Sequence, residues 1–491
     1  MTKSSTALAL VISQSVNFLL IFLFTPYLAR ALPTSDYGTF CQLQLIASLF
    51  GVLTSFGLNQ VAIYIYSNRK FNFNDSVKTL MTAGIVSGVT GTALMAFCGD
   101  WFGATFRNTS LQQLNWAFAP QIAGQQISAV LTHALVYTNQ ARFLLFLTAF
   151  GTASRLVLGV IAIHVFDSLL CFVLVFALEP LASGFAQYCR LRLTGFMGGK
   201  ATIRILWTAY NLARPLYLVT LLGASYTYLS GLLISIWLTQ ADLATYKNGS
   251  IELPIIGTLY GVLSTAFVKD MSRLTSAQHF KALAALKQRL TSNTAAIVFP
   301  FAIYCIFFSK EFVLAYFSER YLDSASIFSI FSFALLFRIQ QYSDVLILLG
   351  EPQTILKCNV VFIASNLALN VSLIGPLGVQ GCAIASVVSL GLLSWLQLHI
   401  TIRKLNVKYT DYLDLRRLFS IALVCACMAS CAKFTAHLLP ISSLPSLILG
   451  FCIFLPATLI LLVKFAYLEL APFRPIFSKL PFIGRLIGEN L

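Results

Sequence analysis

The sequence FLLFLTAFGTASRLVLGVIAIHV occupies residues 143–165 and contains one charged side chain, Arg155, in an otherwise apolar run. A run of about 20 apolar residues is long enough for an α-helix to cross the hydrocarbon core of a bilayer. An arginine in the middle of such a helix costs roughly 2.5–3.5 kcal/mol on the insertion scale, so it is expected to face a wet cavity or a partner. We therefore predict a membrane-spanning helix with a functional or paired cation at Arg155.

The rest of the chain repeats this apolar pattern. Hydrophobic residues make up 58% of the 491 positions and charged residues only 10%, which excludes an ordinary soluble protein of this size. We predict an all-α integral membrane protein with about 14 transmembrane helices joined by short loops. The predicted spans are 8–29, 40–66, 79–98, 114–136, 143–165, 168–188, 206–238, 245–267, 292–315, 325–348, 355–374, 378–401, 418–437 and 443–466.

The distribution of lysine and arginine gives the predicted helices a direction. With a cytoplasmic N-terminus, about 24 of the 33 basic residues fall on the cytoplasmic side, as the positive-inside rule requires. Both termini are then cytoplasmic, and no cleavable signal peptide is evident at the start. The net charge of +16 is thereby explained by topology and contact with anionic lipids, so we predict no nucleic-acid partner.

A weak internal similarity suggests a repeat. Residues 32–40 (LPTSDYGTF) follow the first span, and residues 238–246 (LTQADLATY) follow the seventh with Leu, Asp and Thr in the same order. Six spans before the seventh indicate two parallel six-helix lobes, an arrangement that transporters use for alternating access. We predict an N-lobe at 1–200, a C-lobe at 201–405, and two additional helices with a cytoplasmic tail at 406–491. A helical bundle with a chance match remains the alternative.

Three short motifs resemble a known family. They are Leu28-Ala-Arg-Ala-Leu32 followed by Asp36-Tyr-Gly38, then Ser55-Phe-Gly-Leu-Asn59, and NLALNVSLIGPLGVQGCAIAS at 366–386. Together they resemble the polysaccharide exporters and the O-antigen or lipid-linked oligosaccharide flippases of the MOP superfamily, whose relatives include the lipid II flippase and the multidrug MATE exporters. In that family a proline usually follows the isoleucine directly, whereas here Gly375 intervenes before Pro376.

This resemblance implies a function and a cell location. It implies a MATE-like alternating-access transporter in the bacterial inner membrane. The transporter would move an undecaprenyl-diphosphate-linked oligosaccharide, such as an O-antigen repeat unit, from the cytoplasmic to the periplasmic leaflet. The implied partners are this lipid-linked cargo and membrane lipids. Na⁺ or H⁺ could act as the coupling ion, and polysaccharide polymerases and glycosyltransferases as pathway partners.

Such a cargo needs a polar and preferably cationic cavity, because unsatisfied polar groups cost several kcal/mol in hydrocarbon. Three arginines inside predicted spans match the diphosphate: Arg155, Arg214 and Arg338. Arg338, Gln341 and Tyr342 are spaced at i, i+3 and i+4, which predicts one face of the tenth helix. For Arg155 an ion pair with Glu179 is the alternative, and for Arg214 it is snorkelling to the interface.

Amide side chains in the spans are candidates for sugar recognition. Pairs at helical spacing lie in the first, fourth and eleventh spans, where they could equally form hydrogen bonds between helices. They are Gln14 and Asn17, Gln121 and Gln125, and Asn366 and Asn370.

Three carboxylates in spans, Glu179, Glu252 and Asp344, are candidates for ion coupling. The eleven cysteines are scattered, and Cys425, Cys427 and Cys431 lack a histidine or aspartate at ligand spacing. We predict neither a metal nor a cofactor.

Two other functions compete with the flippase. A MATE-like cation-coupled drug or metabolite antiporter should use carboxylates as its main cavity charges, whereas arginines predominate here. A membrane glycan enzyme such as an O-antigen polymerase usually needs a large outward loop with catalytic residues. The longest predicted outward connection is only about 15 residues and has no acidic cluster, so we expect a transporter and not an enzyme.

Overall fold

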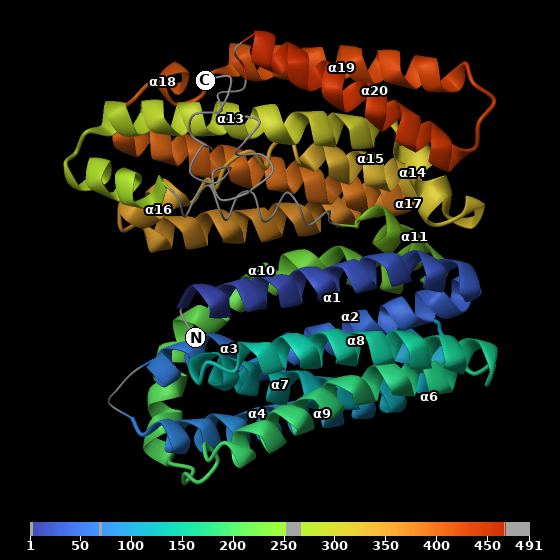
Figure 1. Ribbon diagram of the computed structural model, residues 1–491, viewed down its shortest axis with the longest axis vertical. Coiled ribbons are helices and arrows are strands. Elements are labelled where there is room, and N and C mark those ends of the chain that lie inside the picture. Colours follow the sequence, from blue (N-terminus) through green and yellow to red (C-terminus); the bar gives the residue numbers. More distant parts are fainter. Residues whose placement is uncertain (1–2, 68–70, 252–266, 466, 468–491) are drawn as a thin grey trace. The chain divides into compact units, whose positions relative to one another are not determined.

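The computed structural model describes residues 3–67, 71–251, 267–465 and 467, without the side chains of 3–14, 67, 212–216, 218, 219, 225 and 226. All regular structure in these ranges is helical (Figure 1). The chain forms two compact units. Unit 1 comprises residues 1–248 and 366–382, and unit 2 comprises residues 249–365 and 383–491. The lobe boundaries at residues 200 and 405 stay predictions.

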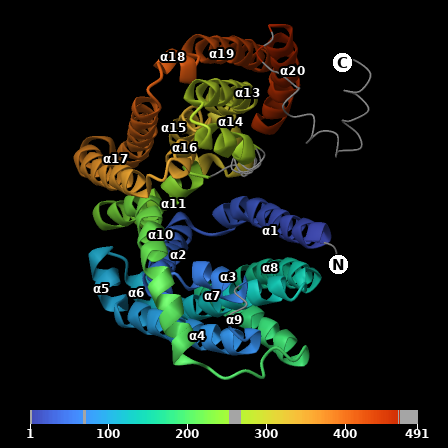
Figure 2. The same cartoon turned by 90° about the vertical axis from the view of Figure 1, so that its left-hand side faces the viewer.

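Unit 1 is built around a layer of long apolar helices. α4 (Phe73–Phe97), α7 (Pro120–Tyr137), α8 (Ala141–His164) and α9 (Leu169–Leu193) lie side by side, and α1 (Lys3–Ala31) packs on α8. The remaining helices of the unit are α2 (Thr34–Ser55), α3 (Leu58–Ser67), α5 (Gly99–Thr105), α6 (Thr109–Phe118), α10 (Ile203–Trp237) and α11 (Gln240–Gly249). Figure 2 shows the long helix α10 running past α2, α3 and α4, which it contacts.

Unit 2 has its own core. α13 (Phe280–Phe307) packs against α15 (Ser324–Ala334) and α19 (Leu415–His437), and α19 packs against α20 (Ser443–Lys464). The other elements are α14 (Ser309–Tyr316), the 3-10 turn η1 (Glu319–Tyr321), α16 (Asp344–Leu348), α18 (Tyr409–Tyr412) and both ends of α17 (Pro352–Leu405). The middle of α17, residues 366–382, belongs to unit 1. α17 consists of two helices joined at Gly378, whose φ of 55° is accessible to glycine at little cost.

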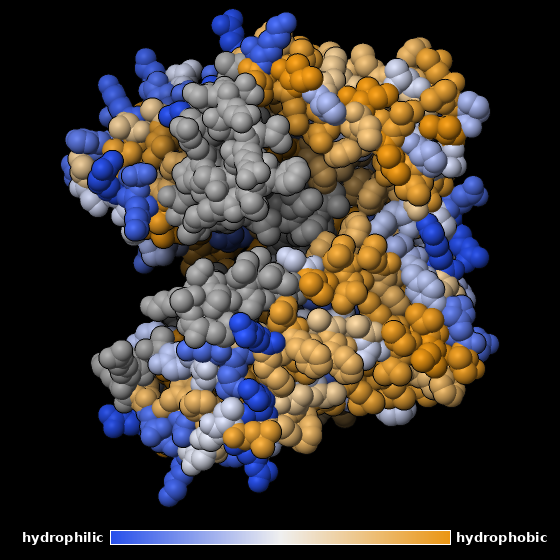
Figure 3. Space-filling model, in the orientation of Figure 1, coloured by the Kyte–Doolittle hydropathy of each residue, from blue (hydrophilic) through white to orange (hydrophobic). Residues whose placement is uncertain are grey.

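The helices have the length and composition of membrane spans. In the described part, eight are long and apolar enough to cross a bilayer: α2, α4, α8, α9, α13, α17, α19 and α20. Shorter apolar helices cover Ser15–Ala31, Thr227–Trp237 and Ser324–Ala334. In Figure 3 the visible flank of unit 1 is largely hydrophobic, and hydrophilic side chains gather at the ends of its helices. The protein is therefore a multi-pass membrane protein, as the sequence predicted.

Several predicted spans are interrupted. The span predicted at 40–66 is divided into α2 and α3, because Phe56 and Gly57 both have positive φ. The span predicted at 114–136 is divided ahead of Pro120, which opens α7. The span predicted at 325–348 is wrong as a single helix, because residues 335–343 leave the helical conformation between α15 and α16.

The two similar segments found in the sequence both open a helix. Pro33 precedes α2, and Thr239 caps α11, where the Asp242 backbone N–H donates to the Thr239 hydroxyl oxygen at 3.2 Å. The two segments also meet inside unit 1, where a Cβ atom at Gly38 would collide with the carbonyl oxygen of Gln240. The Tyr37 hydroxyl donates at 2.8 Å to Oδ1 of Asn248, just beyond the second segment, which joins the start of α2 to the end of α11.

Candidate functional site

A polar pocket of about 260 Å³ lies inside unit 1. Its lining comes from α2, α7, α10 and α11. The lining residues are Gln44, Leu45, Ser48, Gln121, Gln125, Tyr228 and Lys247. We call this set the polar pocket. It combines an ammonium group with three amides and two hydroxyls, and its volume is below the roughly 300–1,000 Å³ of sites that enclose a drug-sized ligand. The polar pocket can therefore hold one part of a larger polar molecule.

The hydrogen-bonding state of this lining is unusual. Gln121 is only 9% exposed, and its Oε1 atom has no hydrogen-bond partner among the described residues. A buried polar group without a partner costs roughly 1–3 kcal/mol, so such groups are uncommon in folded proteins. The neighbouring Gln126, by contrast, donates to the Gly51 carbonyl at 2.6 Å. Gln121 therefore lines the polar pocket with a side chain whose carbonyl oxygen is buried and has no partner among the described residues.

Helical spacing explains how these residues reach one place. Gln44 and Ser48 are four residues apart on α2, and Gln121 and Gln125 are four residues apart on α7, so each pair lies on one helix face. Of this group, the sequence identified Gln121 and Gln125 as candidates. Gln44, Ser48 and Lys247 were missed, although the i, i+4 spacing of the first two was visible in the sequence.

Arg155 lies in an ion pair. Its Nη1 atom is 3.3 Å from Oε2 of Glu179 on α9, and the two side chains are 16% and 21% exposed. The guanidinium carbon lies 5.1 Å from the centre of the Phe176 ring. Gly151 provides room, because a Cβ atom there would lie 2.9 Å from the Glu179 carboxylate. Arg155 and Glu179 are thus brought together as the sequence alternative foresaw, and the pair neutralises both charges within unit 1.

Asn17 also has a partner between helices. The Thr152 hydroxyl on α8 donates to Asn17 Oδ1 on α1 at 2.7 Å. Asn366 and Asn370 are both buried on α17, and Asn370 Nδ2 donates to the Asn366 carbonyl at 2.8 Å. Asn366 Nδ2 and Asn370 Oδ1 have no partner in the described ranges. Asn17 therefore joins two helices, whereas Asn366 and Asn370 each keep one polar atom without a hydrogen bond in the described ranges.

The predicted stripe of Arg338, Gln341 and Tyr342 is wrong, because the three residues do not share a helix. They lie in the non-helical segment 335–343. The Tyr342 hydroxyl donates to the Phe337 carbonyl at 2.8 Å, within the same segment. The Thr291 hydroxyl on α13 donates to Gln340 Oε1 at 3.2 Å. Polar side chains thus support the backbone where the helix is interrupted, as an irregular segment at membrane depth requires.

Asp344 follows this segment and faces Lys287, which lies between the spans predicted at 245–267 and 292–315. Lys287 is buried on α13, its Nζ atom lies 3.8 Å from Asp344 Oδ2, and it also donates to the Gln341 carbonyl at 3.3 Å. The predicted start of the second span at residue 292 is therefore wrong, because α13 begins at Phe280 and includes Lys287, whose ammonium group stabilises the interruption between α15 and α16. We call Lys287, Asp344 and segment 335–343 the helix break.

Three further candidates lie outside the described residues. These are the side chains of Gln14 and Arg214 and the whole of Glu252. Within the described ranges, no group of three or more histidine, cysteine, aspartate or glutamate residues is arranged to hold a metal ion.

Comparison with known proteins identifies the family. A family model described as "Polysaccharide biosynthesis protein" matches residues 27–326. The chain belongs to this family. A search of curated proteins by sequence finds no significant match.

Solved structures establish the fold of this family member. The lipid II flippase MurJ in an inward closed conformation aligns with a TM-score of 0.69 and 13% identity, covering 94% of this chain and 100% of that one. An inward-facing multidrug resistance MATE transporter of the MOP superfamily gives 0.61 and 13%, covering 82% and 98%. A MOP superfamily transporter from Pyrococcus furiosus, reported to have a binding pocket of reverse polarity, gives 0.52 and 14%, covering 81% and 94%. The chain therefore has the MOP transporter fold.

Proposed function

We propose that this protein is a flippase that moves an undecaprenyl-diphosphate-linked oligosaccharide, an O-antigen repeat unit or a similar surface glycan, from the cytoplasmic to the periplasmic leaflet. The family of polysaccharide biosynthesis proteins and the MOP transporter fold support this proposal. The proposed location is the bacterial inner membrane with both termini cytoplasmic, and alternating access is the proposed mode of transport.

The observation that carries the proposal is the lining of the polar pocket. Within the described part of the chain, the side chains of Gln44, Ser48, Gln125 and Tyr228 form no hydrogen bonds, and the Gln121 carbonyl is also unused. Amides and hydroxyls match sugar hydroxyl groups, and the Lys247 ammonium matches a phosphate as a point charge. The polar pocket would thus replace part of the hydration shell that the cargo head group loses.

The ion pairs of Glu179 and Asp344 restrict where a coupling ion could bind. The Glu179 carboxylate faces Arg155 and the Asp344 carboxylate faces Lys287, so each carboxylate already has a cationic neighbour. A sodium ion at either position would have to displace that side chain. We infer that coupling to Na⁺, if it occurs, uses other groups. A proton could couple to transport at these positions only by neutralising a carboxylate and so separating it from its cationic neighbour.

Complementation tests the proposed function. A bacterium that lacks its O-antigen flippase should recover surface glycan when this protein is expressed with its cognate glycan pathway. Lys247→Met should abolish the recovery, because the variant removes the ammonium group while keeping an unbranched side chain. Lys310→Gln, which removes an exposed charge, is the matched control and should retain export. Absence of glycan recovery together with increased drug resistance would refute the flippase and establish the antiporter.

A further inference from the structure

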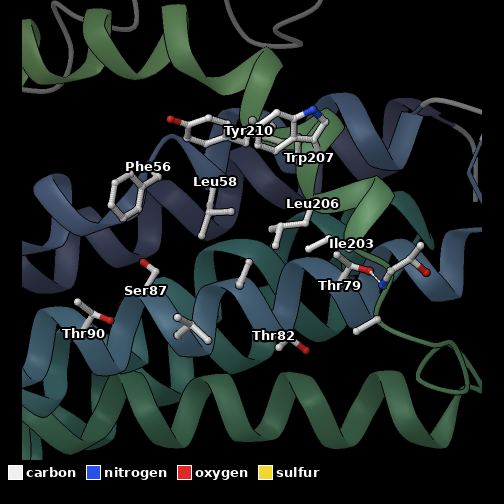
Figure 4. Close-up of a pocket in the computed structure, with 16 residues that line it drawn as sticks. Phe56, Leu58, Thr79, Thr82, Ser87, Thr90, Ile203, Leu206, Trp207 and Tyr210 are labelled. Carbon is white, nitrogen blue, oxygen red and sulfur yellow. Dashed lines mark hydrogen bonds between the residues drawn. The ribbon is translucent and has the colours of Figure 1, made fainter.

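A second pocket of unit 1 has the opposite chemistry. Its volume is about 840 Å³, and it lies between α3, α4 and the first two turns of α10 (Figure 4). We call it the apolar pocket. Its lining residues are Phe56, Leu58, Val61, Thr79, Thr82, Ala83, Val86, Ser87, Thr90, Ala201, Thr202, Ile203, Leu206, Trp207, Ala209 and Tyr210.

Most hydroxyl groups in this lining are already used. Thr79 donates to the Asp75 carbonyl at 2.7 Å and accepts from the Thr202 backbone N–H at 2.9 Å. The Ser87 hydroxyl donates to the Thr54 carbonyl at 2.7 Å, and the Thr82 hydroxyl donates to the Lys78 carbonyl at 2.9 Å. These groups therefore offer little to a polar ligand, and the apolar pocket suits a hydrocarbon chain.

Basic residues flank the end of the apolar pocket at which α4 and α10 begin. Lys78 precedes Thr79 on α4, Lys200 precedes Ala201, and Arg204 follows Ile203 on α10. Lys200 and Arg204 are exposed. The nearby carboxylate of Asp75 accepts the Lys200 backbone N–H at 2.8 Å, so its charge is partly engaged by the backbone. This end carries more positive than negative side chains and fits a phosphate group.

Two aromatic rings mark the same end as a membrane interface. Trp207 and Tyr210 are stacked with their ring centres 5.8 Å apart, and Trp207 is 64% exposed. Tryptophan and tyrosine concentrate at the level of the lipid head groups, and lysine and arginine concentrate in cytoplasmic loops. The head-group end of the apolar pocket therefore corresponds to the cytoplasmic leaflet in the predicted topology, where anionic phospholipids attract such basic residues.

We propose that the apolar pocket binds an acyl chain of an anionic phospholipid from the cytoplasmic leaflet, with the lipid phosphate held by Lys78, Lys200 and Arg204. The bound lipid would fill the space between α4 and α10. This proposal does not depend on the identity of the cargo, since no residue of the polar pocket takes part in it.

Quenching of tryptophan fluorescence by brominated lipid tests this site, because quenching requires contact with the brominated chain. The purified protein would be reconstituted in phosphatidylcholine containing a small fraction of brominated phosphatidylglycerol or, in parallel, brominated phosphatidylcholine. The difference between wild type and Trp207→Phe isolates the signal of Trp207. We expect the anionic lipid to quench Trp207 as if enriched roughly fivefold or more over the zwitterionic one.

Variants distinguish a built site from general attraction. Lys200→Gln with Arg204→Gln should abolish the enrichment, whereas Arg142→Gln with Arg192→Gln, which removes two exposed charges elsewhere in unit 1, should preserve it. Equal quenching by the two lipids, or enrichment that survives the first pair of substitutions, would overturn the proposal. Loss of quenching on addition of a small fraction of polyprenyl phosphate would also overturn it and assign the apolar pocket to the cargo tail.

Discussion

The polar pocket in unit 1 and the helix break in unit 2 use polar residues in opposite ways. In the polar pocket, amides and hydroxyls from three helices are left without hydrogen bonds to the rest of the described chain. At the helix break, Lys287 and Asp344 neutralise each other, and Lys287 also satisfies a backbone carbonyl. Burial of a polar group alone therefore does not indicate a transport site. Unused hydrogen-bonding capacity facing a pocket is the more informative feature.

The largest loss of stability is expected when Lys287 is substituted. Lys287→Met would remove the ammonium group that faces the largely buried Asp344 carboxylate, and removal of one member of a buried pair costs about 3–5 kcal/mol. We expect a large fall in the midpoint of thermal unfolding of the purified protein. The double variant Lys287→Met with Asp344→Leu should recover most of the loss, because no buried charge then remains. An unchanged midpoint in the single variant would show that the pair does not stabilise the helix break.

The pair of Arg155 and Glu179 lies between these two cases, because it is partly buried and Arg155 is also a predicted cargo ligand. Glu179→Gln should destabilise unit 1 by about 2 kcal/mol, less than at the helix break because both side chains retain some solvent exposure. The double variant Arg155→Met with Glu179→Leu should recover the unfolding midpoint. If the pair is only structural, glycan export recovers as well. Export that stays absent in the stable double variant would instead make Arg155 a cargo ligand.

Substitution of Gln121 is expected to change the free energy of unfolding in the opposite direction. Gln121→Leu removes a buried acceptor that has no partner, so the free energy of unfolding should rise by about 1 kcal/mol. Export should fall in the same variant, because the polar pocket loses one contact to the head group. Gln126→Leu is the matched control, since it removes the donor to the Gly51 carbonyl and should lower stability. Lower stability in Gln121→Leu would contradict the view that its carbonyl is unused.

The smallest effect is expected at the exposed pair of Glu351 and Lys404. The Lys404 ammonium, 2.5 Å from Glu351 Oε1, and the Thr354 hydroxyl lower the pKa of the Glu351 carboxyl below its usual value. A lowered pKa in the folded state means that the pair stabilises the protein above the pKa of the unfolded chain, about 4.3, and that this contribution is lost as the pH falls through the folded-state value. Unfolding midpoints of wild type and Lys404→Gln should therefore differ slightly at pH 7 and converge in acid.

The neighbouring exposed residue offers the control for that titration. Arg403→Gln removes a positive charge beside Lys404, and Arg403 has no salt bridge to Glu351. It should shift the midpoint less than Lys404→Gln at pH 7. Equal shifts in the two variants would mean that general charge repulsion, and not the pairing with Glu351, determines the effect.

The sequence predicted the membrane fold well, because apolar runs of span length report directly on the bilayer. It also identified Gln121 and Gln125, whose spacing defines one helix face, and the alternative of an Arg155–Glu179 pair. It failed at residues 335–343, because the sequence of this segment does not reveal that α13 supplies hydrogen-bond partners to it. Lys287 was left between the spans predicted at 245–267 and 292–315, because the depth of a lysine depends on neighbours that only the tertiary structure shows.

The most direct test of the central claim is binding of a polyprenyl-diphosphate-linked oligosaccharide to the purified double variant Gln44→Leu with Gln125→Leu. Neither side chain has a hydrogen bond to lose within the described chain, so the unfolding midpoint should be unchanged. If each amide forms one hydrogen bond of about 1 kcal/mol with the head group, the affinity should fall roughly 30-fold relative to wild type. An affinity equal to that of wild type, at the same stability, would contradict the assignment of the polar pocket to the cargo.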